Sequence, residues 1–311
     1  MKLVFLDRKS IGSDIDLSNF ETFGEVVNYD FTYPDEVAER VTDADIIVVN
    51  KTLVNEETIG NAKNLKLVCV TATGTNNLDK EYLEKRNIAW RNVAGYSTES
   101  VAQHTFALMF YLFEHLPYYD QYVSSKGYMG DKLFTHFDRH FSELYQKTWG
   151  IIGLGAIGKR VAELAKAFGC HVQYYSTSGN NHNTDYKEVD FEELLRTSDI
   201  VSIHAPLDEN TEGLMNYEAF QKMKKEALLI NVGRGPIIVE EDLACAIEEG
   251  LIAGAALDVL SDEPMSENCP LKRLLDDDRL FITPHIAWAS VEARHRLMDI
   301  IYGQIEEFLN S

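Results

Sequence analysis

Three side chains with complementary acid–base chemistry occur in the second half of the sequence. Arg234, Glu263 and His285 each come shortly after an apolar, strand-like run. Histidine exchanges a proton near neutral pH, a neighbouring carboxylate orients its ring, and arginine binds a carboxylate through two parallel hydrogen bonds. Because ligands of open α/β sheets bind at the carboxyl ends of the strands, we expect the three side chains to converge there. Such a group suits hydride transfer to a 2-oxo acid, although each residue taken singly also fits a structural or surface role.

A glycine-rich segment precedes these residues. Gly153, Gly155 and Gly158 stand in G-x-G-x-x-G spacing between a strand-like apolar run and an amphipathic helical segment. In this context the first glycine permits a tight turn, the second lets the backbone approach a pyrophosphate, and the third allows close packing of helix on strand. The first N–H groups of the helix, which include those of Ala156 and Ile157, have no intrahelical partners and attract anions. The segment therefore predicts a dinucleotide site.

The ends of later strands supply further candidate contacts for the dinucleotide. These candidates are Ser176, Thr177, His204, Ala205, Pro206, Val232 and Gly233. An acidic residue normally follows the second strand of such a unit and binds the ribose 2′-hydroxyl of NAD. Here no carboxylate follows that strand until Asp185. We therefore predict that NADP(H) is accepted as well as NAD(H); alternatively, backbone groups hold the ribose and Ser176 has no selective role.

A second glycine-containing turn lies in the first hundred residues. Thr73, Gly74 and Thr75 follow an apolar run, and such a turn can direct several N–H groups toward an anion. It is either a cradle for a substrate carboxylate or an ordinary turn. Lys51, just past an earlier strand-like run, either adds positive charge to the same site or is a solvated surface lysine.

The elements that would position these residues alternate between strand and helix patterns. This alternation predicts parallel sheets covered by helices, and no glycine fingerprint follows the first strand. The pattern changes near residue 98 to a long helix that we expect to continue through Val123, and a closing helix is expected over 290–309. We predict two doubly wound α/β domains, with a Rossmann dinucleotide-binding domain (99–288) inserted into a flavodoxin-like substrate domain (1–98 and 289–311).

The composition restricts the choice of partners. The 311 residues include 29 Lys and Arg against 50 Asp and Glu, a net charge of −21, which disfavours binding to nucleic acid or to anionic membranes. The apolar run 106–113 is too short to span a bilayer and predicts a helix buried between domains or subunits. The four cysteines are widely spaced, no metal-ligand cluster is visible, and a cytoplasmic location is expected.

The sequence segments around the candidate residues resemble motifs of the D-isomer-specific 2-hydroxyacid dehydrogenase family. The similar segments follow one another in the family's order and cover nearly the whole chain; they are 72–77, 101–105, 153–158, 231–235, 257–264 and 283–288. Residues 141–144 and 285–288 are most similar to the glycerate dehydrogenase (hydroxypyruvate reductase) branch.

This resemblance implies a role for each candidate. Arg234 would anchor the substrate and polarise its carbonyl, His285 would be the general acid/base, and Glu263 its partner. The resemblance also implies a substrate-carboxylate cradle at residues 73–75, a homodimer built largely on the nucleotide domains, and no metal. Asp258 and Asn231 would lie near the nicotinamide and ribose.

Two alternatives stay open. The first is a different substrate, such as lactate or a bulkier 2-hydroxy acid, because the side-chain pocket depends on loops around Lys51, Tyr96 and Trp288. The second is a nucleotide-sensing, corepressor-like binding protein on the same scaffold, which the lack of a basic patch disfavours. The D configuration of the product follows only from the resemblance.

Overall fold

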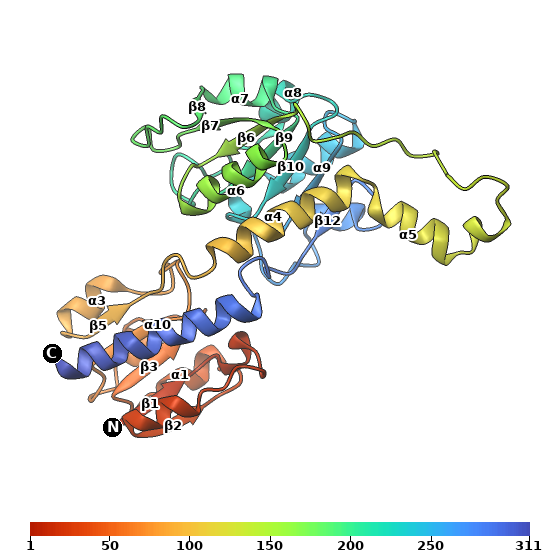
Figure 1. The fold of residues 1–311 in the computed structure, drawn as a ribbon. Coiled ribbons are helices and arrows are strands. Elements are labelled where there is room, and N and C mark those ends of the chain that lie inside the picture. Colours follow the sequence, from red (N-terminus) through yellow and green to blue (C-terminus); the bar gives the residue numbers. More distant parts are fainter. The chain divides into compact units, whose positions relative to one another are not determined.

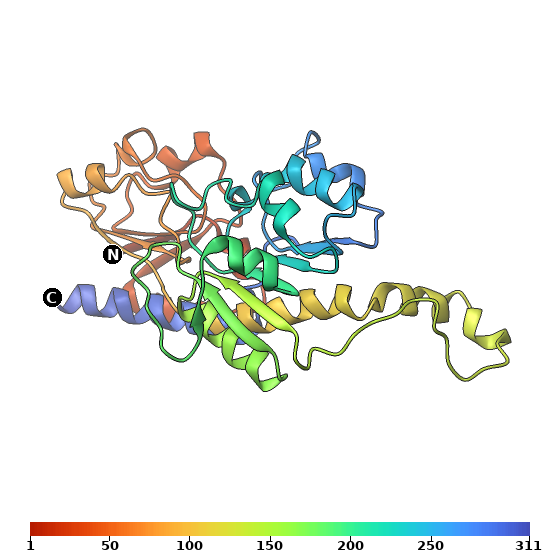
Figure 2. The same cartoon turned by 90° about the horizontal axis from the view of Figure 1, so that it is seen from above.

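A computed structural model describes all residues, 1–311, and the chain divides into two compact units. Unit 1 comprises Met1–Ser97 and Ala289–Ser311, and unit 2 comprises Thr98–Trp288. Each unit is a parallel β-sheet covered by helices (Figures 1 and 2). The predicted fold class, two α/β domains with parallel sheets, is confirmed.

Unit 1 contains a five-stranded sheet in the order β2-β1-β3-β4-β5, which is the flavodoxin-like order. Every residue of β3 and β4, the two strands that continue the centre of the sheet, is buried. The strands are β1 (Lys2–Phe5), β2 (Glu25–Asn28), β3 (Ile46–Val49), β4 (Leu67–Val70) and β5 (Ala89–Arg91). The helices are η1 (Arg8–Ile11), η2 (Ser18–Phe23), η3 (Pro34–Glu36), α1 (Val37–Arg40), α2 (Glu56–Ile59), α3 (Lys80–Lys85) and α10 (Val291–Asn310).

Unit 2 contains a seven-stranded sheet in the order β12-β11-β10-β9-β6-β7-β8. The strand order reverses at β6, and in doubly wound sheets this switch point is where a dinucleotide binds. The strands are β6 (Thr148–Ile152), β7 (His171–Tyr175), β8 (Lys187–Glu188), β9 (Ile200–Ile203), β10 (Leu228–Asn231), β11 (Gly254–Leu257) and β12 (Leu280–Ile282). The helices are α4 (Thr98–Phe113), α5 (Leu116–Ser124), η4 (Gly127–Gly130), α6 (Ala156–Ala167), α7 (Phe191–Thr197), α8 (Tyr217–Lys222), η5 (Gly235–Ile237), α9 (Glu240–Glu248) and η6 (Pro270–Leu274).

The sheet of unit 2 separates two hydrophobic cores. Successive strand residues point to opposite faces, and along β10 Leu229 joins one cluster while Leu228 and Ile230 join the other. The first cluster includes side chains of α7, α8 and α9, and the second includes those of α4 and α6. The apolar run 106–113 is thus part of a core within unit 2.

The single long helix expected from residue 98 to Val123 is wrong, because two helices occupy this stretch. α4 ends at Phe113 and α5 begins at Leu116, with His115 in the left-handed region at φ 52° between them. Pro117 explains the break, since it has no N–H to donate to the Phe113 carbonyl and its ring would clash with that carbonyl.

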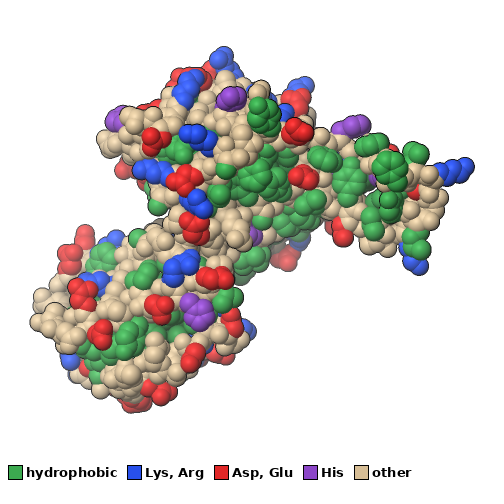
Figure 3. All heavy atoms as spheres, in the orientation of Figure 1, with side chains coloured by type: hydrophobic (Ala, Val, Ile, Leu, Met, Phe, Trp, Pro, Cys, Tyr) green, Lys and Arg blue, Asp and Glu red, His purple; other side chains and the backbone are tan.

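Residues 115–146, called the arm below, extend from unit 2 as α5, η4 and an irregular return segment (Figure 1). The arm exposes large apolar side chains, among them Met129 (80%), Phe134 (87%) and Phe137 (70%), and hydrophobic side chains are visible over it in Figure 3. Arg139 donates a hydrogen bond of 2.8 Å to Asp278 and so ties the return segment to the body of the unit. No helix of the protein combines the length and the apolar character that crossing a membrane requires.

Candidate active site

The three acid–base candidates leave the same edge of the unit 2 sheet. The pairing register places Asn231 beside Leu257 and Leu257 beside Ile282, so the loops that follow β10, β11 and β12 begin at one level. These loops carry Arg234, Glu263 and His285 respectively. Arg234 and His285 are partly buried, whereas Glu263 is exposed. The parallel register therefore brings the three loops to one edge, as the sequence predicts.

Gly235 brings the first two of these loops into direct contact. A Cβ added at this position would lie 1.9 Å from the carbonyl carbon of Leu260, a distance that no side chain tolerates. The backbone next to Arg234 is thus packed against the segment that leads to Glu263. Only glycine permits this approach.

His285 and Glu263 form a hydrogen-bonded pair. The Nδ1 atom of His285 lies 2.7 Å from Oε2 of Glu263, whose Oε1 accepts a 3.1 Å bond from the N–H of Leu260. The side chains remain 28% and 27% exposed. Nε2 of His285 makes no hydrogen bond within the structure. A carboxylate on Nδ1 fixes the ring and its tautomer, which leaves Nε2 to exchange a proton with a ligand.

Asp258 holds the loop that carries His285. Its backbone carbonyl accepts from the N–H of His285 at 2.9 Å, and its carboxylate accepts from the N–H groups of Ile286 and Ala287, both at 2.8 Å. His285 has φ 54°, a strained conformation for a histidine. Three consecutive N–H groups bound by one residue stabilise this conformation. Asp258 is 2% exposed, so its observed contacts position the loop, and its contact with a cofactor stays a prediction.

A buried asparagine shapes the loop that carries Arg234. Asn231 is inaccessible to solvent; its Nδ2 donates to the carbonyl of Arg234 and its Oδ1 accepts from the N–H of Gly233, both at 2.9 Å. Nη1 of Arg234 donates to the Gly233 carbonyl at 2.7 Å. Because both ends of its amide are used by the loop, Asn231 acts on the site through Arg234.

The glycine fingerprint lies between β6 and α6, and its three glycines meet different surroundings. A Cβ at Gly153 (φ 89°) would lie 2.8 Å from the backbone of Ala205, and one at Gly158 would lie 2.3 Å from the Gly153 carbonyl oxygen. A Cβ at Gly155 would meet no protein atom within 4 Å. The fold itself therefore requires the first and third glycines. The second leaves open space at the N-terminus of α6, which fits a pyrophosphate close to the backbone.

The loop after β7 folds back onto the glycine fingerprint. Nδ2 of Asn181 donates to the carbonyl of Leu154 at 2.6 Å, and the buried hydroxyl of Ser176 accepts from the N–H of Asn181 at 3.3 Å. Thr177 is half-buried beside it. The hydroxyl of Ser176 is thus used within the loop.

His204 is the last member of a buried chain of hydrogen-bonded side chains. Nε1 of Trp149 donates to the hydroxyl of Ser202 at 2.8 Å, and that hydroxyl lies 3.0 Å from Nε2 of His204. Nδ1 of His204 is buried without a hydrogen-bond partner. Burial lowers the pKa of His204 to about 3. The next residue, Ala205, lies against Gly153.

The turn at residues 73–75 in unit 1 offers unused donors. The N–H groups of Thr73, Gly74 and Thr75 donate to no acceptor in the structure. The turn is held from the side, because Nδ2 of Asn92 donates to the Thr73 carbonyl at 2.7 Å and the Thr73 hydroxyl donates to the Val93 carbonyl at 3.0 Å. A fixed turn with several free N–H groups is an arrangement that binds a carboxylate.

Asp7 orders the neighbouring loop that carries Lys51. Its carboxylate accepts from the N–H groups of Asn50 at 2.8 Å and Lys51 at 3.3 Å, and from the hydroxyl of Thr52 at 3.0 Å. These residues follow β3, and Asp7 follows β1, at the edge where residues 73–75 follow β4. Trp288, the remaining predicted substrate contact, packs partly buried against a core cluster of unit 2.

Several residues that position the site were not singled out from the sequence. Besides Asp7, they include Ser100 and His104 on α4, and Thr283 before His285. Ser100 donates to the Ala287 carbonyl at 2.6 Å, and Nε2 of His104 lies 3.1 Å from the Thr283 hydroxyl. The one available signal was the presence of polar side chains in an otherwise apolar helix. No group of three or more His, Cys, Asp or Glu side chains is arranged to hold a metal ion.

Known proteins are similar to this chain in sequence and in fold. Residues 106–287 match the model of the D-isomer specific 2-hydroxyacid dehydrogenase, NAD binding domain. A hydroxypyruvate reductase of Blautia hydrogenotrophica is 38% identical over 317 aligned positions, which cover 99% of this chain and 97% of the relative. A glycerate dehydrogenase of Methylorubrum extorquens is 35% identical over 311 positions, with 99% and 96% covered.

A solved structure is similar over the full length. An acyclic imino acid reductase in complex with NADPH and D-Arg superposes with a TM-score of 0.87 and 30% identity, covering 100% of this chain and 97% of that chain. The family model spans the glycine fingerprint and all three acid–base residues. The chain therefore belongs to the D-isomer specific 2-hydroxyacid dehydrogenase family.

Proposed function

We propose that the protein reduces a small 2-oxo acid to the D-2-hydroxy acid with NADH or NADPH, with hydroxypyruvate and glyoxylate as its substrates. The observation that carries this proposal is the His285–Glu263 pair, with Nε2 of His285 left unpaired at the sheet edge that also carries Arg234. The names of the two relatives, hydroxypyruvate reductase and glycerate dehydrogenase, support the choice of substrate. Their full-length similarity favours an enzyme over a sensor protein.

Each residue has a defined part in this reaction. A bound nicotinamide cofactor supplies the hydride that reduces the carbonyl carbon. His285, protonated on Nε2, donates the proton that the carbonyl oxygen gains, and Glu263 stabilises the charged ring. Arg234 binds the substrate carboxylate and polarises the carbonyl. Residues 73–75, with their free N–H groups, are proposed as a carboxylate-binding turn, and Lys51 and Trp288 as further substrate contacts.

The glycine loop is proposed to hold the cofactor. Gly155 faces open space, and the N–H groups of Ala156 and Ile157 begin α6, which suits a pyrophosphate. Ser176 and Thr177 are proposed to lie at the ribose, with the segments 204–206 and 232–233 and Asp258 along the rest of the dinucleotide. Since no carboxylate follows β7 until Asp185, we propose that NADPH is accepted. Ser176→Asp should then lower the use of NADPH relative to NADH; an unchanged ratio would contradict this.

We also propose a homodimer in a reducing compartment such as the cytoplasm. The exposed aromatic side chains of the arm support the dimer, because soluble proteins seldom leave such a surface uncovered. All four cysteines are free thiols, which supports the reducing compartment. Light scattering of the purified protein would measure the mass; a monomer at micromolar concentration would contradict the dimer.

The decisive experiment follows nicotinamide absorbance with hydroxypyruvate, glyoxylate, pyruvate and a bulky 2-oxo acid, each with NADH and with NADPH. Fast turnover of hydroxypyruvate or glyoxylate would support the proposal. Turnover of only pyruvate or the bulky acid would retain the chemistry and replace the substrate. Cofactor binding without any turnover would contradict the enzymatic function and favour the sensor.

A further inference from the structure

A chain of polar side chains runs from helix α4 to the loop that carries His285. Nε2 of His104 lies 3.1 Å from the hydroxyl of Thr283 and 3.6 Å from Oδ1 of Asp258. The Thr283 hydroxyl in turn donates to Oδ1 of Asp258 at 2.6 Å. None of these contacts includes Arg234, Glu263 or the imidazole of His285. The three residues therefore lie one layer behind the acid–base pair.

The direction of each hydrogen bond in this chain follows from the chemistry of the groups. A hydroxyl has a single hydrogen, and that of Thr283 goes to Asp258, so its oxygen accepts from His104. Nε2 of His104 must then carry a proton. Burial lowers the pKa of His104, although Asp258 opposes this effect. The ring is therefore neutral at pH 7, and its one N–H is directed to Thr283.

Asp258 depends on these donors. Its carboxylate is almost completely buried and receives the Thr283 hydroxyl together with the N–H groups of Ile286 and Ala287. A buried carboxylate keeps its orientation only while its oxygens are hydrogen-bonded. If the hydroxyl is removed, Oδ1 loses the shortest of its bonds and the carboxylate can turn. The two N–H bonds that hold the segment after His285 then weaken.

We propose that His104 and Thr283 are positioning residues, which act through Asp258 to keep His285 in the conformation that directs Nε2 at the substrate. Ser100 supports the far end of the same segment by donating to the Ala287 carbonyl. The loop thus has two attachments to α4, one at each end of residues 283–287. This inference rests on the proposed function in one respect, since it takes the proton transfer by His285 as the step that the positioning serves.

The test compares two Thr→Val substitutions that have the same shape and remove the same group. Thr283→Val removes the hydroxyl from the chain, whereas Thr105→Val removes a buried hydroxyl next to His104 that donates only to the Val101 carbonyl within α4. We expect kcat for hydroxypyruvate to fall about tenfold to 100-fold in Thr283→Val, as misplaced catalytic groups do, with NADH affinity unchanged. Thr105→Val should retain kcat, and Thr283→Ser should restore most of it. His104→Phe should resemble Thr283→Val.

Hydrogen exchange of the peptide that spans residues 283–288 provides a readout independent of activity. We expect faster exchange in Thr283→Val and His104→Phe than in Thr105→Val, with the rest of unit 2 unchanged. Unaltered exchange and kcat in both variants would overturn the inference while leaving the function intact. If the parent protein were inactive, the proposed function would fail, and exchange alone would decide the positioning role. If Thr283→Val did not fold, His104→Phe and Thr283→Ser would decide it.

Discussion

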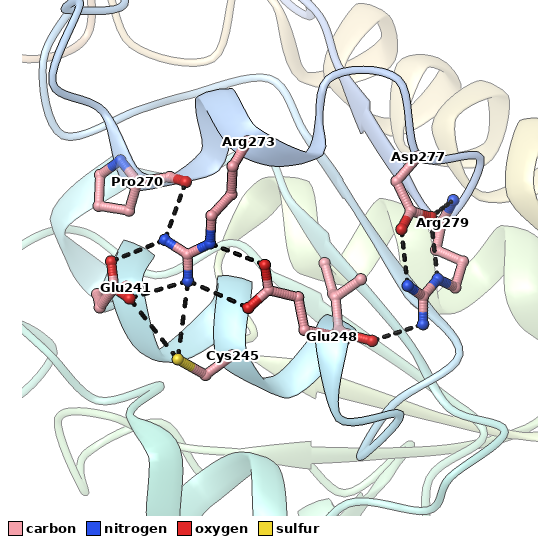
Figure 4. A network of polar contacts seen from close by, with 8 residues as sticks. Glu241, Cys245, Glu248, Pro270, Arg273, Asp277 and Arg279 are labelled. Atoms are coloured by element: carbon pink, nitrogen blue, oxygen red, sulfur yellow. Dashed lines mark hydrogen bonds and ion pairs between the residues drawn. The ribbon is translucent and has the colours of Figure 1, made fainter.

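Two polar regions of unit 2 use similar residues in opposite ways. Around Arg273, shown in Figure 4, every strong donor meets an acceptor: the guanidinium binds Glu241 and Glu248 of α9, and a second arginine, Arg279, binds Asp277. At the sheet edge, by contrast, His285 is paired on Nδ1 alone. The first region is complete without a ligand, and the second is not.

The difference separates groups that stabilise the fold from groups that are candidates for binding a ligand. The Arg273 cluster joins η6 to α9 at the surface, where solvent screens its charges. The groups without partners are found elsewhere: Nε2 of His285, Nδ1 of His204 and the N–H groups of residues 73–75. They lie at the carboxyl ends of parallel strands, where ligands bind. Both regions contain charged side chains, so charge does not distinguish them; the presence of polar groups without hydrogen-bond partners does.

The largest effect should come from removing the imidazole of His285. In His285→Ala we expect kcat to fall about 10²-fold to 10⁴-fold, the usual contribution of a general acid, with NADH affinity retained. Steady-state absorbance assays and fluorescence titration of NADH measure the two quantities. His171→Ala, at an exposed position of β7, is the control. Near-normal turnover in His285→Ala would show that the unpaired Nε2 of His285 does not mark the reactive site.

The second effect should separate ligand binding from stability in the glycine loop. In Gly155→Val the new side chain lies in open space, so we expect little change in Tm. NADH affinity should fall about tenfold to 100-fold, because the side chain would overlap the bound cofactor. Gly158→Ala should instead lower Tm, because its Cβ would lie 2.3 Å from the Gly153 carbonyl oxygen. Unchanged NADH affinity in Gly155→Val would show that the space is not used by the cofactor.

The third effect concerns the buried imidazole of His204. Its pKa is lowered to about 3 by burial, so between that value and the ordinary histidine range the unfolded chain binds a proton that the folded protein does not. Stability is then complete above about pH 6.5 and declines as the pH falls, by up to about 1.4 kcal/mol per pH unit. His204→Gln should reduce this slope. Urea unfolding at several pH values measures it, and parallel slopes would contradict the prediction.

The smallest effect should come from the Arg273 cluster. Arg273→Ala is expected to lower the unfolding free energy by about 1 kcal/mol or less and to leave kcat unchanged. The hydrogen bond from Arg273 is the main cause of the lowered pKa of Glu241, so this stabilisation is present above the ordinary glutamate range and is lost as the pH falls through the lowered pKa. Urea unfolding at a series of pH values from 7 downward should show a difference that shrinks as the pH falls. A loss of turnover would indicate that the cluster is not purely structural.

Much of the fold could be predicted from the sequence because hydrophobic periodicity and composition are local properties of the chain. The alternation of strand-like and helical patterns predicted the parallel sheets of both units, since buried parallel strands are short apolar runs. β8 was missed because Lys187 and Glu188 are exposed and polar. The break between α4 and α5 was also missed, although Pro117 was visible, because the apolar pattern continues across it.

The candidate site divides in the same way. The identities of Arg234, Glu263 and His285, and the glycine spacing, followed from residue types at strand ends and from resemblance. That Asn231 and Asp258 serve the loops was not foreseen, because an amide or carboxylate in a sequence does not show which N–H groups will lie within its reach. The contacts that link α4 to residues 283 and 287 join segments about 180 positions apart.

By itself the sequence determined the fold class, the dinucleotide fingerprint and the residues able to transfer a proton, since each depends on residue type and short-range spacing. Only the tertiary structure decided which polar groups are satisfied and which stay free. Hydrogen-bond partners are chosen by distance and direction in space, and residues remote in the chain become neighbours only when the parallel strands align. That alignment pairs Glu263 with one nitrogen of His285 and leaves the other unpaired.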